Sequence, residues 1–298
     1  MDVLTPPMVQ NPGMETHIHP FEVFSKHKKS STDLFLHTSP EFHMKSILAT
    51  EEDLNDIFTI SYCFRDEPRS DIHREQFLML EWYRKFTRYE KIMDDVEFLI
   101  LSVSKHLEEK KIPLKHKYSA TDFQRATVQE IFKEFTNIDI LNFLDTNELK
   151  KLIQKDFKGV PLPSVECSWD DYFFLLFLNE VEPHFKNYKS LLLYEFPEPL
   201  SALSTIKETD SRVCERFEVY LNGIELCNCF NELTDLNIQK QRFDIQKQEK
   251  KSLYNYDLPE PTDFYQTLKG GYPKSSGIAL GVERLLYSLV EIKNPFFK

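Results

Sequence analysis

The order of apolar and polar residues predicts strands in the first and last thirds of the chain. Residues 56–64 (DIFTISYCF) and 77–84 (FLMLEWYR) are short apolar segments on either side of a polar stretch, which is typical of two strands joined by a loop. Residues 190–197 (SLLLYEFP) and 212–230 are strand-like again. Asn222-Gly223 interrupts the second of these segments and favours a tight turn between two strands.

Helical spacing dominates the middle of the chain. In residues 91–111 apolar side chains recur every three or four positions, which predicts an amphipathic helix. Residues 120–185 are predicted to be mostly helical, with 123–135 and 172–185 as the clearest segments. A polar helix is expected over about 233–251.

Two segments lead from a strand into a helix. Leu34–Leu36 is a short apolar strand, and a helix is predicted to begin at Ser39-Pro40-Glu41. Serine can cap a helix, proline fits its first turn and glutamate favours its positive end. Residues 277–290 (GIALGVERLLYSLV) combine a glycine-containing strand with a final helix.

Strands at both ends of a helical block predict an α+β fold with an antiparallel sheet flanked by helices. The 298 residues are 41% apolar and 29% charged, with only 7 glycines, so the chain is expected to fold throughout. We expect one domain over residues 1–298, with a central helical insertion at about 105–185.

The formal net charge of −11 excludes a basic surface over the whole chain and so disfavours nucleic acid as a general partner. The basic residues within Lys105–Lys117 leave a local patch as an alternative to a solvated helix end. Five cysteines without a CxxC pair predict reduced thiols and no zinc site.

The apolar runs of this chain are too short for a membrane segment. The longest, Tyr172–Leu178, is far below the length that spans a bilayer. Residues 1–20 do not have the basic start and apolar core of a signal peptide. A cytoplasmic protein with no membrane partner is therefore expected.

Glu225 and Glu232 are a first candidate site, because two carboxylates on or beyond one strand can hold a divalent metal with phosphates or neutralise an ammonium group. Strict alternation along the strand places Glu225, Cys227 and Cys229 on one face and Asn228 on the other. A site that includes Asn228 therefore requires a bulge or bend. Ordinary surface carboxylates are an equally good interpretation of the spacing alone.

Two further candidates combine arginine with carboxylate or glycine. Arg65 could clamp a phosphate while Glu67 orients it, although an exposed ion pair in a hairpin explains the same residues. Gly277 and Gly281 would let the backbone approach a ligand, and Arg284 would meet a phosphate. A tight turn is the alternative explanation for the glycines.

Seven stretches occur in an order that resembles a known family: TPPMV, TSPEFHMK, FRDE, HREQF, LEWYR, FEVYLNGIELCNCFNELTD and SSGIALGVERLL. Together they resemble the three signature motifs of class II aminoacyl-tRNA synthetases of the lysyl branch. The chain particularly resembles the elongation factor P–(R)-β-lysine ligase family, which looks like a lysyl-tRNA synthetase catalytic domain without the anticodon-binding domain. The resemblance covers nearly the whole chain and is least clear in about 105–185.

The resemblance implies a pocket for an amino acid with two amino groups. Its expected residues are Ser39, Pro40, Glu41, Tyr83, Asn228, Glu232 and Ala279. Two ammonium groups require a carboxylate-rich pocket, which Glu41 and Glu232 would supply. Ala279 stands where lysyl-tRNA synthetases resemble one another in having glycine and the β-lysine ligases have alanine, and its methyl group fits an isomer of lysine.

The resemblance also implies ATP and Mg²⁺ as cofactors. The expected ATP-binding residues are Arg65, Asp66, Glu67, Arg74, Phe77, Glu225, Leu226, Gly281 and Arg284. Arg65 and Arg284 would be the catalytic residues at the α-phosphate, and Phe77 would stack on adenine. Glu225 and Glu232 would bind magnesium. No protein nucleophile is expected.

The chain departs from the family pattern at several positions. Residues 73–77 read HREQF where the family reads HNPEF, so Arg74 and Gln76 replace residues on the adenine side. Cys229 replaces a glycine and is expected to crowd the site floor. The sequence begins within the first motif, near Pro6, without the interface helix expected before it. How the expected homodimer forms is therefore left open.

The resulting hypothesis is an ATP-dependent ligase. It would form the adenylate of a lysine-type amino acid, (R)-β-lysine, and transfer the acyl group to a lysine of elongation factor P, with no tRNA as substrate. Two alternatives stay open: a minimal lysyl-tRNA synthetase-like activating enzyme, and a non-catalytic paralogue that binds lysine or nucleotide. Charging of tRNA would favour the first, and ligand binding without adenylate formation would favour the second.

Overall fold

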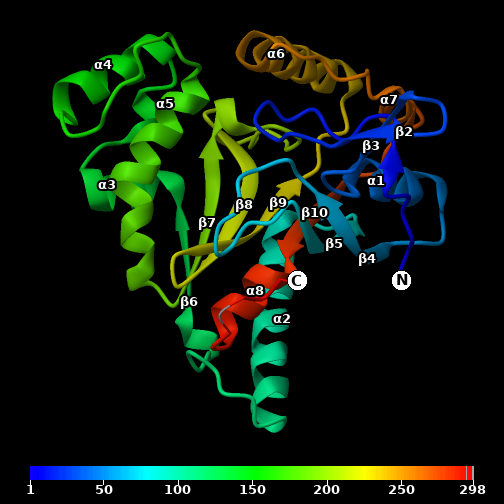
Figure 1. Cartoon of the computed structure of the whole chain (residues 1–298). Helices are drawn as coiled ribbons and strands as arrows, with labels where there is room; N and C mark the ends of the chain where they lie inside the picture. The colour runs from blue at the N-terminus through cyan, green and yellow to red at the C-terminus, as the bar shows by residue number, and fades with distance from the viewer. Residues whose placement is uncertain (293, 297–298) are drawn as a thin grey trace. The chain divides into compact units, whose positions relative to one another are not determined.

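The computed structural model describes residues 1–292 and 294–296, which form two compact units (Figure 1). The first unit contains Met1–Arg88, Glu232–Tyr287 and the described residues from Glu291 onward; the second contains Tyr89–Asn231 and Ser288–Val290. Each unit has both strands and helices, which confirms the predicted α+β class. That the two units make up one catalytic domain stays a prediction.

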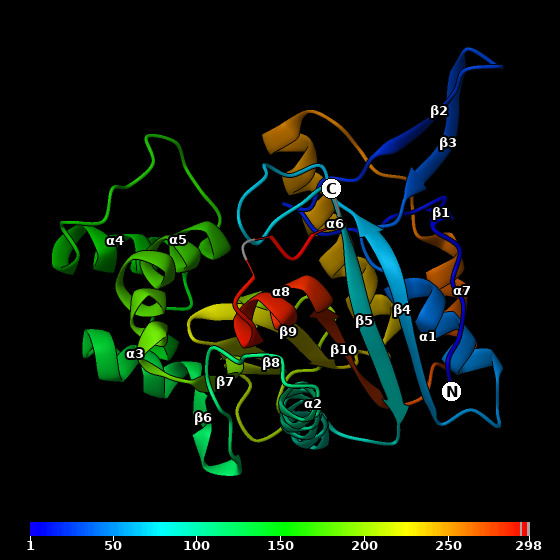
Figure 2. The same cartoon turned by 60° about the horizontal axis from the view of Figure 1, so that its bottom comes forward.

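Three antiparallel strands form the main sheet of the first unit (Figure 2). They are β4 (Asp56–Phe64), β5 (Gln76–Lys85) and β10 (Ser275–Gly281), and β5 lies between the other two. The two strands predicted on either side of the polar loop are confirmed. Burial alternates along β5, so that Glu81 and Tyr83 are buried on one face. This face positions the polar groups described below.

A second, smaller sheet of the first unit has the order β1–β3–β2. It consists of β1 (Met8–Val9), β2 (Glu22–Ser25) and β3 (Ser30–Leu36), all antiparallel, and β2 and β3 form a hairpin. Helix α1 (Glu41–Thr50) follows β3, as predicted. Pro40 occupies the N-cap position, and Oγ of Ser39 accepts a hydrogen bond of 3.2 Å from the backbone nitrogen of Glu41.

Three more helices belong wholly or mainly to the first unit: α6 (Leu236–Tyr254), α7 (Thr262–Lys269) and α8 (Val282–Leu289). The side chain of Asp235 accepts hydrogen bonds from the first backbone N–H groups of α6 and so fixes where this helix begins. Asn255 ends it in the left-handed conformation, with φ of 57°. The predicted polar helix is confirmed, a few residues further along the chain than expected.

Four strands form the sheet of the second unit: β6 (Phe123–Thr127), β7 (Ser190–Pro197), β8 (Val213–Leu221) and β9 (Ile224–Asn231). Strands β7, β8 and β9 are antiparallel, and β6 pairs in parallel with β7. The predicted tight turn between β8 and β9 is confirmed, because Asn222 and Gly223 both have positive φ.

The prediction of a helix over residues 123–135 is wrong for its first five residues. Phe123–Thr127 form strand β6, and α3 (Val128–Thr136) begins only afterwards. The side chains of Thr127 and Glu130 each bond to the other's backbone nitrogen, a capping box that sets this boundary. Parallel pairing with β7 holds the preceding residues in an extended conformation. Pairing with so distant a strand cannot be recognised from the local sequence pattern.

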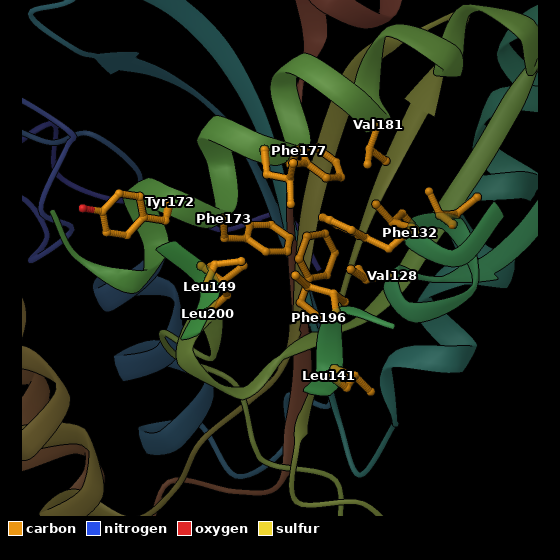
Figure 3. Close-up of a cluster of buried hydrophobic side chains, with 14 of the residues drawn as sticks. Val128, Phe132, Leu141, Leu149, Tyr172, Phe173, Phe177, Val181, Phe196 and Leu200 are labelled. Atoms are coloured by element: carbon orange, nitrogen blue, oxygen red, sulfur yellow. The ribbon is translucent and has the colours of Figure 1, made fainter. Parts of the chain in front are cut away.

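An aromatic core fills the helical part of the second unit (Figure 3). Phe132 from α3 and Phe173 from α5 (Trp169–Leu176) have ring centroids 5.3 Å apart, and Phe177 lies 5.6 Å from Phe173. All three side chains are buried, and burial of such a side chain stabilises the fold by roughly 2–3 kcal/mol. The helical prediction for 172–185 is confirmed, with α5 continuing through a π-helical turn and a 3₁₀ turn.

Two further helices complete the second unit. Helix α2 (Tyr89–Glu109) confirms the predicted amphipathic helix, and Ile92, Val96 and Ile100 on its apolar face are fully buried. Helix α4 (Thr146–Asp156) packs its Leu149 and Ile153 into the aromatic core.

Candidate functional site

A buried cluster of charges lies between α1 and the segment that follows β9. Glu41 and Lys45 are one helical turn apart on α1, and Glu232 is the first residue after β9. Nζ of Lys45 lies 2.6 Å from Oε1 of Glu41 and 2.5 Å from Oε2 of Glu232. The Lys45 and Glu232 side chains are each only 1% exposed, so water screens this interaction little.

Burial and pairing act in opposite directions on these groups. Burial alone would lower the pKa of Lys45, but the carboxylates of Glu232 and Glu41 reverse this and raise it, so the ammonium stays charged. Burial raises the pKa of Glu232 to about 8; Lys45 opposes this shift, and the like charge of Glu41 adds to it. The cluster therefore holds protons when no further cation is present.

Strand β5 adds a third carboxylate and a hydroxyl to this cluster. Oη of Tyr83 donates a hydrogen bond of 3.2 Å to Oε2 of Glu81, and both side chains are buried. Burial, and next the charge of Glu41, raise the pKa of Glu81 well above its ordinary value. Within the described residues, Oε1 of Glu81 is buried without a hydrogen-bond partner. Such an oxygen is an available acceptor for a ligand ammonium.

Gly277 on β10 makes room for the Tyr83 ring. The two residues are directly opposite in the β5–β10 register. A Cβ on Gly277 would lie 2.1 Å from Cε1 of Tyr83 and 2.6 Å from Oε1 of Glu232, closer than any packed carbon permits. Ala279, predicted to form the pocket floor, is half-buried and lies opposite Glu81 in the same register.

The cluster has the charge of a diamine-binding pocket. Glu41, Glu81 and Glu232 carry three negative charges when ionised, and Lys45 carries one positive charge, which gives a formal balance of −2. Two ammonium groups on one ligand would neutralise it. The sequence alone did not identify Glu81 and Lys45 as residues of the site. The alternation that places Glu81 on the face of Tyr83, and the i,i+4 spacing of Lys45 from Glu41, are the signals that could have found them.

Arg65 and Phe77 lie side by side at the end of the β4–β5 pair. The guanidinium carbon of Arg65 is 5.3 Å from the centroid of the Phe77 ring. Nε of Arg65 donates to the carbonyl of Thr38 at 3.4 Å, and its backbone nitrogen donates to the carbonyl of Glu75 at 2.9 Å. A cation beside an open aromatic face suits a ligand with both a phosphate and a flat base.

The loop between β4 and β5 is held largely by its own residues. Arg74 donates to the carbonyls of Ser70 and His73, and its guanidinium carbon lies 4.7 Å from the ring centroid of Phe296. Nη2 of Arg284 is 2.8 Å from Nε2 of His73. Arg284 thus reaches this loop, whereas the contacts of Arg74, predicted to bind ATP, are with the loop backbone and a residue near the chain end.

A β-bulge in β9 corrects the predicted arrangement of Glu225. Cys227 pairs with Val219 and Glu225 pairs with the next residue of β8, so Leu226 is one extra residue in the strand. The prediction that Glu225 shares a face with Cys227 and Cys229 is therefore wrong. The bulge that Asn228 requires is present, and it brings Asn228 to the face of Glu225.

The two cysteines of β9 lie on its other face. By register, Cys229 is opposite Phe217 and Cys227 is opposite Val219, all of them buried. Burial raises the pKa of the Cys227 thiol well above its ordinary value, so it remains protonated. Cys229 is thus on the face of the strand away from Asn228, contrary to the expectation that it crowds the floor of a site there.

Strand β8 presents Glu218 to the same face as Glu225 and Asn228. Arg216 donates a hydrogen bond to Oε1 of Glu218, and Oη of Tyr220 donates one of 2.7 Å to Oε2. Burial raises the pKa of Glu218 to about 7, Arg216 lowers it, and Glu225 raises it again. Oδ1 of Asn228 is buried and has no hydrogen-bond partner among the described residues. This face therefore offers oxygen atoms of the kind that magnesium prefers.

Glu225 and Glu232, predicted to bind magnesium together, belong to different units. The Glu232 carboxylate is paired with Lys45 in the first unit, and Glu225 lies in the second unit near Glu218. Within residues 1–292 and 294–296, no three histidine, cysteine, aspartate or glutamate side chains form a group that could hold a metal ion. A shared site of Glu225 and Glu232 stays a prediction.

Nearly the whole chain matches the model of a synthetase family. The family model described as tRNA synthetases class II (D, K and N) matches residues 1–294. In the part of the chain that the structure describes, none of the helices combines the length and the apolar character needed to cross a membrane.

Several curated proteins are similar to the chain over nearly its full length. Elongation factor P–(R)-β-lysine ligase of Proteus mirabilis is 33% identical over 96% of this chain and 83% of that protein. The protein of the same name from Enterobacter is 34% identical with the same coverage. That from Hamiltonella defensa is 33% identical over 99% of this chain and 86% of its own.

Proposed function

The chain belongs to the class II tRNA synthetases (D, K and N) and, among them, to the elongation factor P–(R)-β-lysine ligase family, and from this premise we propose its reaction. The protein activates a lysine-type amino acid, (R)-β-lysine, as the aminoacyl-adenylate at the expense of ATP. It then transfers the acyl group to a lysine side chain of elongation factor P. The similarity to these ligases over nearly the full length of the chain and the chemistry of the buried cluster support this proposal.

The charge balance of the buried cluster is the observation that carries the proposal. Glu41, Glu81 and Glu232 outnumber Lys45 by two charges, and the Oε1 atom of Glu81 has no partner among the described residues. A monoamino acid would supply only one of these charges and leave one buried carboxyl protonated, because burial raises the pKa values of Glu81 and Glu232. A diamino acid supplies both charges. Tyr83 then orients Glu81 for the ammonium it receives.

The remaining residues of the amino-acid pocket take supporting roles in the proposal. Ser39 and Pro40 shape the start of α1 beside Glu41, and Ala279 adjusts the space for the lysine isomer. Ala279 lies opposite Glu81, so its methyl group limits the room beside that carboxylate.

Arg65 and Phe77 are proposed to hold ATP. The guanidinium group would bind the α-phosphate and the substrate carboxylate, and the adjacent ring would stack on adenine. Arg284 would neutralise the charge that develops as pyrophosphate leaves. Asp66, Glu67, Arg74, Leu226 and Gly281 are proposed as further ATP contacts. Because reactants aligned beside fixed cations need no protein nucleophile, these residues suffice for adenylate formation.

Magnesium is proposed to bind at the face of β8 and β9 that carries Glu225. The unpartnered Oδ1 of Asn228 and the carboxylate of Glu225 fit a hard cation that keeps waters and phosphate oxygens as its other ligands, whereas both oxygens of Glu218 already accept from Arg216 and Tyr220. Bound magnesium would supply positive charge to the phosphates of ATP. In this proposal Glu232 serves the amine pocket, where its Lys45 partner already lies.

A homodimer in the cytoplasm is part of the proposal, with no tRNA as substrate. Phe58, Ile60 and Tyr62 alternate along β4, and all three are exposed, by 40%, 56% and 42%. Three large apolar side chains in a row on one strand face are typical of a protein interface. We assign this face to a second copy of the chain. Sedimentation of the protein, with Ile60→Lys as the disrupting variant, tests the assignment.

Pyrophosphate exchange with each lysine isomer tests the first half of the reaction, and mass spectrometry of elongation factor P after incubation with the protein, ATP and (R)-β-lysine tests the second. We expect exchange with a diamino acid and a mass increase of one β-lysyl group. Exchange with none of the isomers by folded protein would refute the proposal. Charging of tRNA in place of elongation factor P would instead identify a minimal tRNA synthetase.

A further inference from the structure

A small cavity of the first unit lies against the start of α1. Its volume of about 10 Å³ is roughly what one water-sized group requires. Its lining includes Gly13, Glu15, His37, Ser39 and Glu41. Glu41 also belongs to the buried cluster of charges, whereas Glu15 and His37 have no role in any step described so far. The cavity therefore adjoins the proposed amino-acid pocket.

The imidazole of His37 offers an acceptor that no donor uses. The side chain is 1% exposed, and its Nε2 atom lies 2.7 Å from the carbonyl oxygen of Tyr62. Because a carbonyl can only accept, Nε2 carries the hydrogen of this bond, and Nδ1 of the neutral ring keeps its lone pair. Nδ1 is buried and has no hydrogen-bond partner among the described residues. Burial lowers the pKa of His37 against the effect of the Tyr62 carbonyl, so the ring is neutral near pH 7.

The chain on both sides of Glu15 positions its carboxylate at the cavity. A Cβ on Gly13 would lie 2.5 Å from Oε2 of Glu15 and 3.2 Å from Oγ1 of Thr38, so the carboxylate occupies space that a side chain would fill. Gly13 has φ of 132°, a conformation that favours glycine. On the other side, Oγ1 of Thr16 donates a hydrogen bond of 3.1 Å to Oε2 of Glu249 on α6. The carboxylate is therefore in place before a ligand arrives.

Charges of both signs act on Glu15. Burial and then the like charge of Glu41 raise its pKa, whereas its own backbone N–H and the cations Arg65 and Lys250 act in the opposite direction. Lys250 offsets the added negative charge, so the balance of −2 in the buried cluster is unchanged. Nε of Arg65 donates to the carbonyl of Thr38, the residue between two that line the cavity. The cavity thus lies near the guanidinium that is proposed to bind the substrate carboxylate.

We propose that this cavity binds the ammonium group nearer to the substrate carboxylate, with the Glu15 carboxylate and Nδ1 of His37 as its acceptors. The inference rests on the proposed function and adds to it two residues that decide which amino acids are accepted. A primary ammonium group is about the size of a water molecule and carries three N–H donors, so it fits both the volume and the acceptors of the cavity. Glu81 and Tyr83 then serve the ammonium group at the far end of the substrate.

The cavity sets two limits on the class of substrate. An ω-amino acid such as 6-aminohexanoate has the distant ammonium group but leaves the acceptors of the cavity without a donor. An acetyl group on the nearer nitrogen of β-lysine would remove its charge and exceed the volume of the cavity. Both compounds should bind more weakly than (R)-β-lysine. The accepted class is therefore amino acids with two free ammonium groups, one of them close to the carboxylate.

Glu15→Gln is the diagnostic variant, because the amide keeps the shape of the side chain and removes its charge. His37→Gln removes Nδ1, while its amide can still donate to the Tyr62 carbonyl. Glu249→Gln is the matched control, since this half-buried carboxylate bonds Thr16 beside Glu15 but does not line the cavity. Calorimetry with the full chain measures the affinities for (R)-β-lysine and 6-aminohexanoate, and pyrophosphate exchange with (R)-β-lysine measures adenylate formation.

We expect the affinity for (R)-β-lysine to fall about 100-fold in Glu15→Gln and about tenfold in His37→Gln. The affinity for 6-aminohexanoate should stay within about twofold of wild type in both variants, because this ligand has no group for the cavity. Glu249→Gln should keep both affinities. Unchanged binding of (R)-β-lysine by Glu15→Gln would mean that the cavity holds only water and would overturn the inference. An equal loss for the two ligands would overturn it as well, since it would indicate a structural role.

Failure of the inference and failure of the proposed function give different results. Wild-type exchange with (R)-β-lysine, combined with wild-type affinities that are equal for (R)-β-lysine and 6-aminohexanoate, would overturn the inference alone. Absence of wild-type exchange with every lysine isomer would remove the proposed function, and the inference with it.

Discussion

Nζ of Lys45 lies 2.5 Å from Oε2 of Glu232, although the two residues belong to segments far apart in the chain. The pair joins α1 to the residue that follows β9, inside the first unit, and both side chains are almost completely buried. A buried pair of this kind is costly to break, because the partner that remains loses its counter-charge. The contact therefore contributes both to the stability of the first unit and to the charge that the pocket presents to the substrate.

Lys45→Met should destabilise the first unit. The variant leaves Glu41 and Glu232 close together without a cation, and we expect the free energy of unfolding to fall by about 3 kcal/mol. Urea unfolding followed by circular dichroism measures this. Lys91→Met is the control, since Lys91 pairs with Asp94 on the surface and its loss should cost at most about 1 kcal/mol. Equal stability of the two variants would show that the buried pair contributes nothing.

Binding of a lysine isomer should release a proton below pH 8. Burial raises the pKa of Glu232 to about 8 in the free protein, so this carboxyl holds part of a proton near neutral pH even beside Lys45. A ligand ammonium favours the ionised form, lowers the pKa and drives the proton off. Calorimetry at pH 7 in two buffers of different ionisation enthalpy counts the released protons. Glu232→Gln should release fewer, and an unchanged count in that variant would assign the proton to another group.

Gly277→Ala should weaken both amino-acid binding and the fold. The added methyl group would meet the Tyr83 ring at 2.1 Å, so the ring must move away from Glu81. We expect KM for the lysine isomer to rise at least tenfold, with a stability loss of about 1–3 kcal/mol. Gly159→Ala is the control, because a Cβ there meets nothing within 4 Å. A KM that stays at the wild-type value would show that the Tyr83 position is unimportant for binding.

Arg65→Ala should abolish adenylate formation. Arg65 is the cation beside the Phe77 ring, and removal of a preorganised charge at a reacting phosphate costs about 100-fold to 1000-fold in rate. Pyrophosphate exchange at saturating ATP measures the loss. Arg69→Ala, in the same loop, is a suitable comparison, because Arg69 is largely exposed and pairs with Glu75. Wild-type exchange by Arg65→Ala would remove this residue from the mechanism.

Alternation and turn signals were enough to predict most strands of the fold. The sequence predicts β4 because its apolar pattern is bounded by polar residues on both sides, and it predicts the β8–β9 hairpin because Asn222-Gly223 favours positive φ. The sequence does not predict β6, because its five residues are held extended by parallel pairing with β7. The local composition of a segment does not show which distant strand it will pair with.

The candidate site was predictable only where its residues follow one another in the chain. Glu41 and Tyr83 lie in motifs that could be read, and the structure places both in the buried cluster. The pairing of Lys45 with Glu232 depends on a distant segment, and the extra residue Leu226 is visible only through its pairing with β8. Sequence alternation alone therefore assigned the wrong neighbours to Glu225.

Because of the bulge at Leu226, the number of residues between the hairpin turn and Asn228 decides which side chains of β9 share a face with Glu225. One residue more or fewer between the hairpin turn and Asn228 would turn the carboxamide inward and present the thiols of Cys227 and Cys229 in its place. Substitutions in this segment change one side chain at a time, whereas a change in its length exchanges an oxygen-bearing surface for a sulfur-bearing one. The length of this short segment is thus constrained more strictly than its composition.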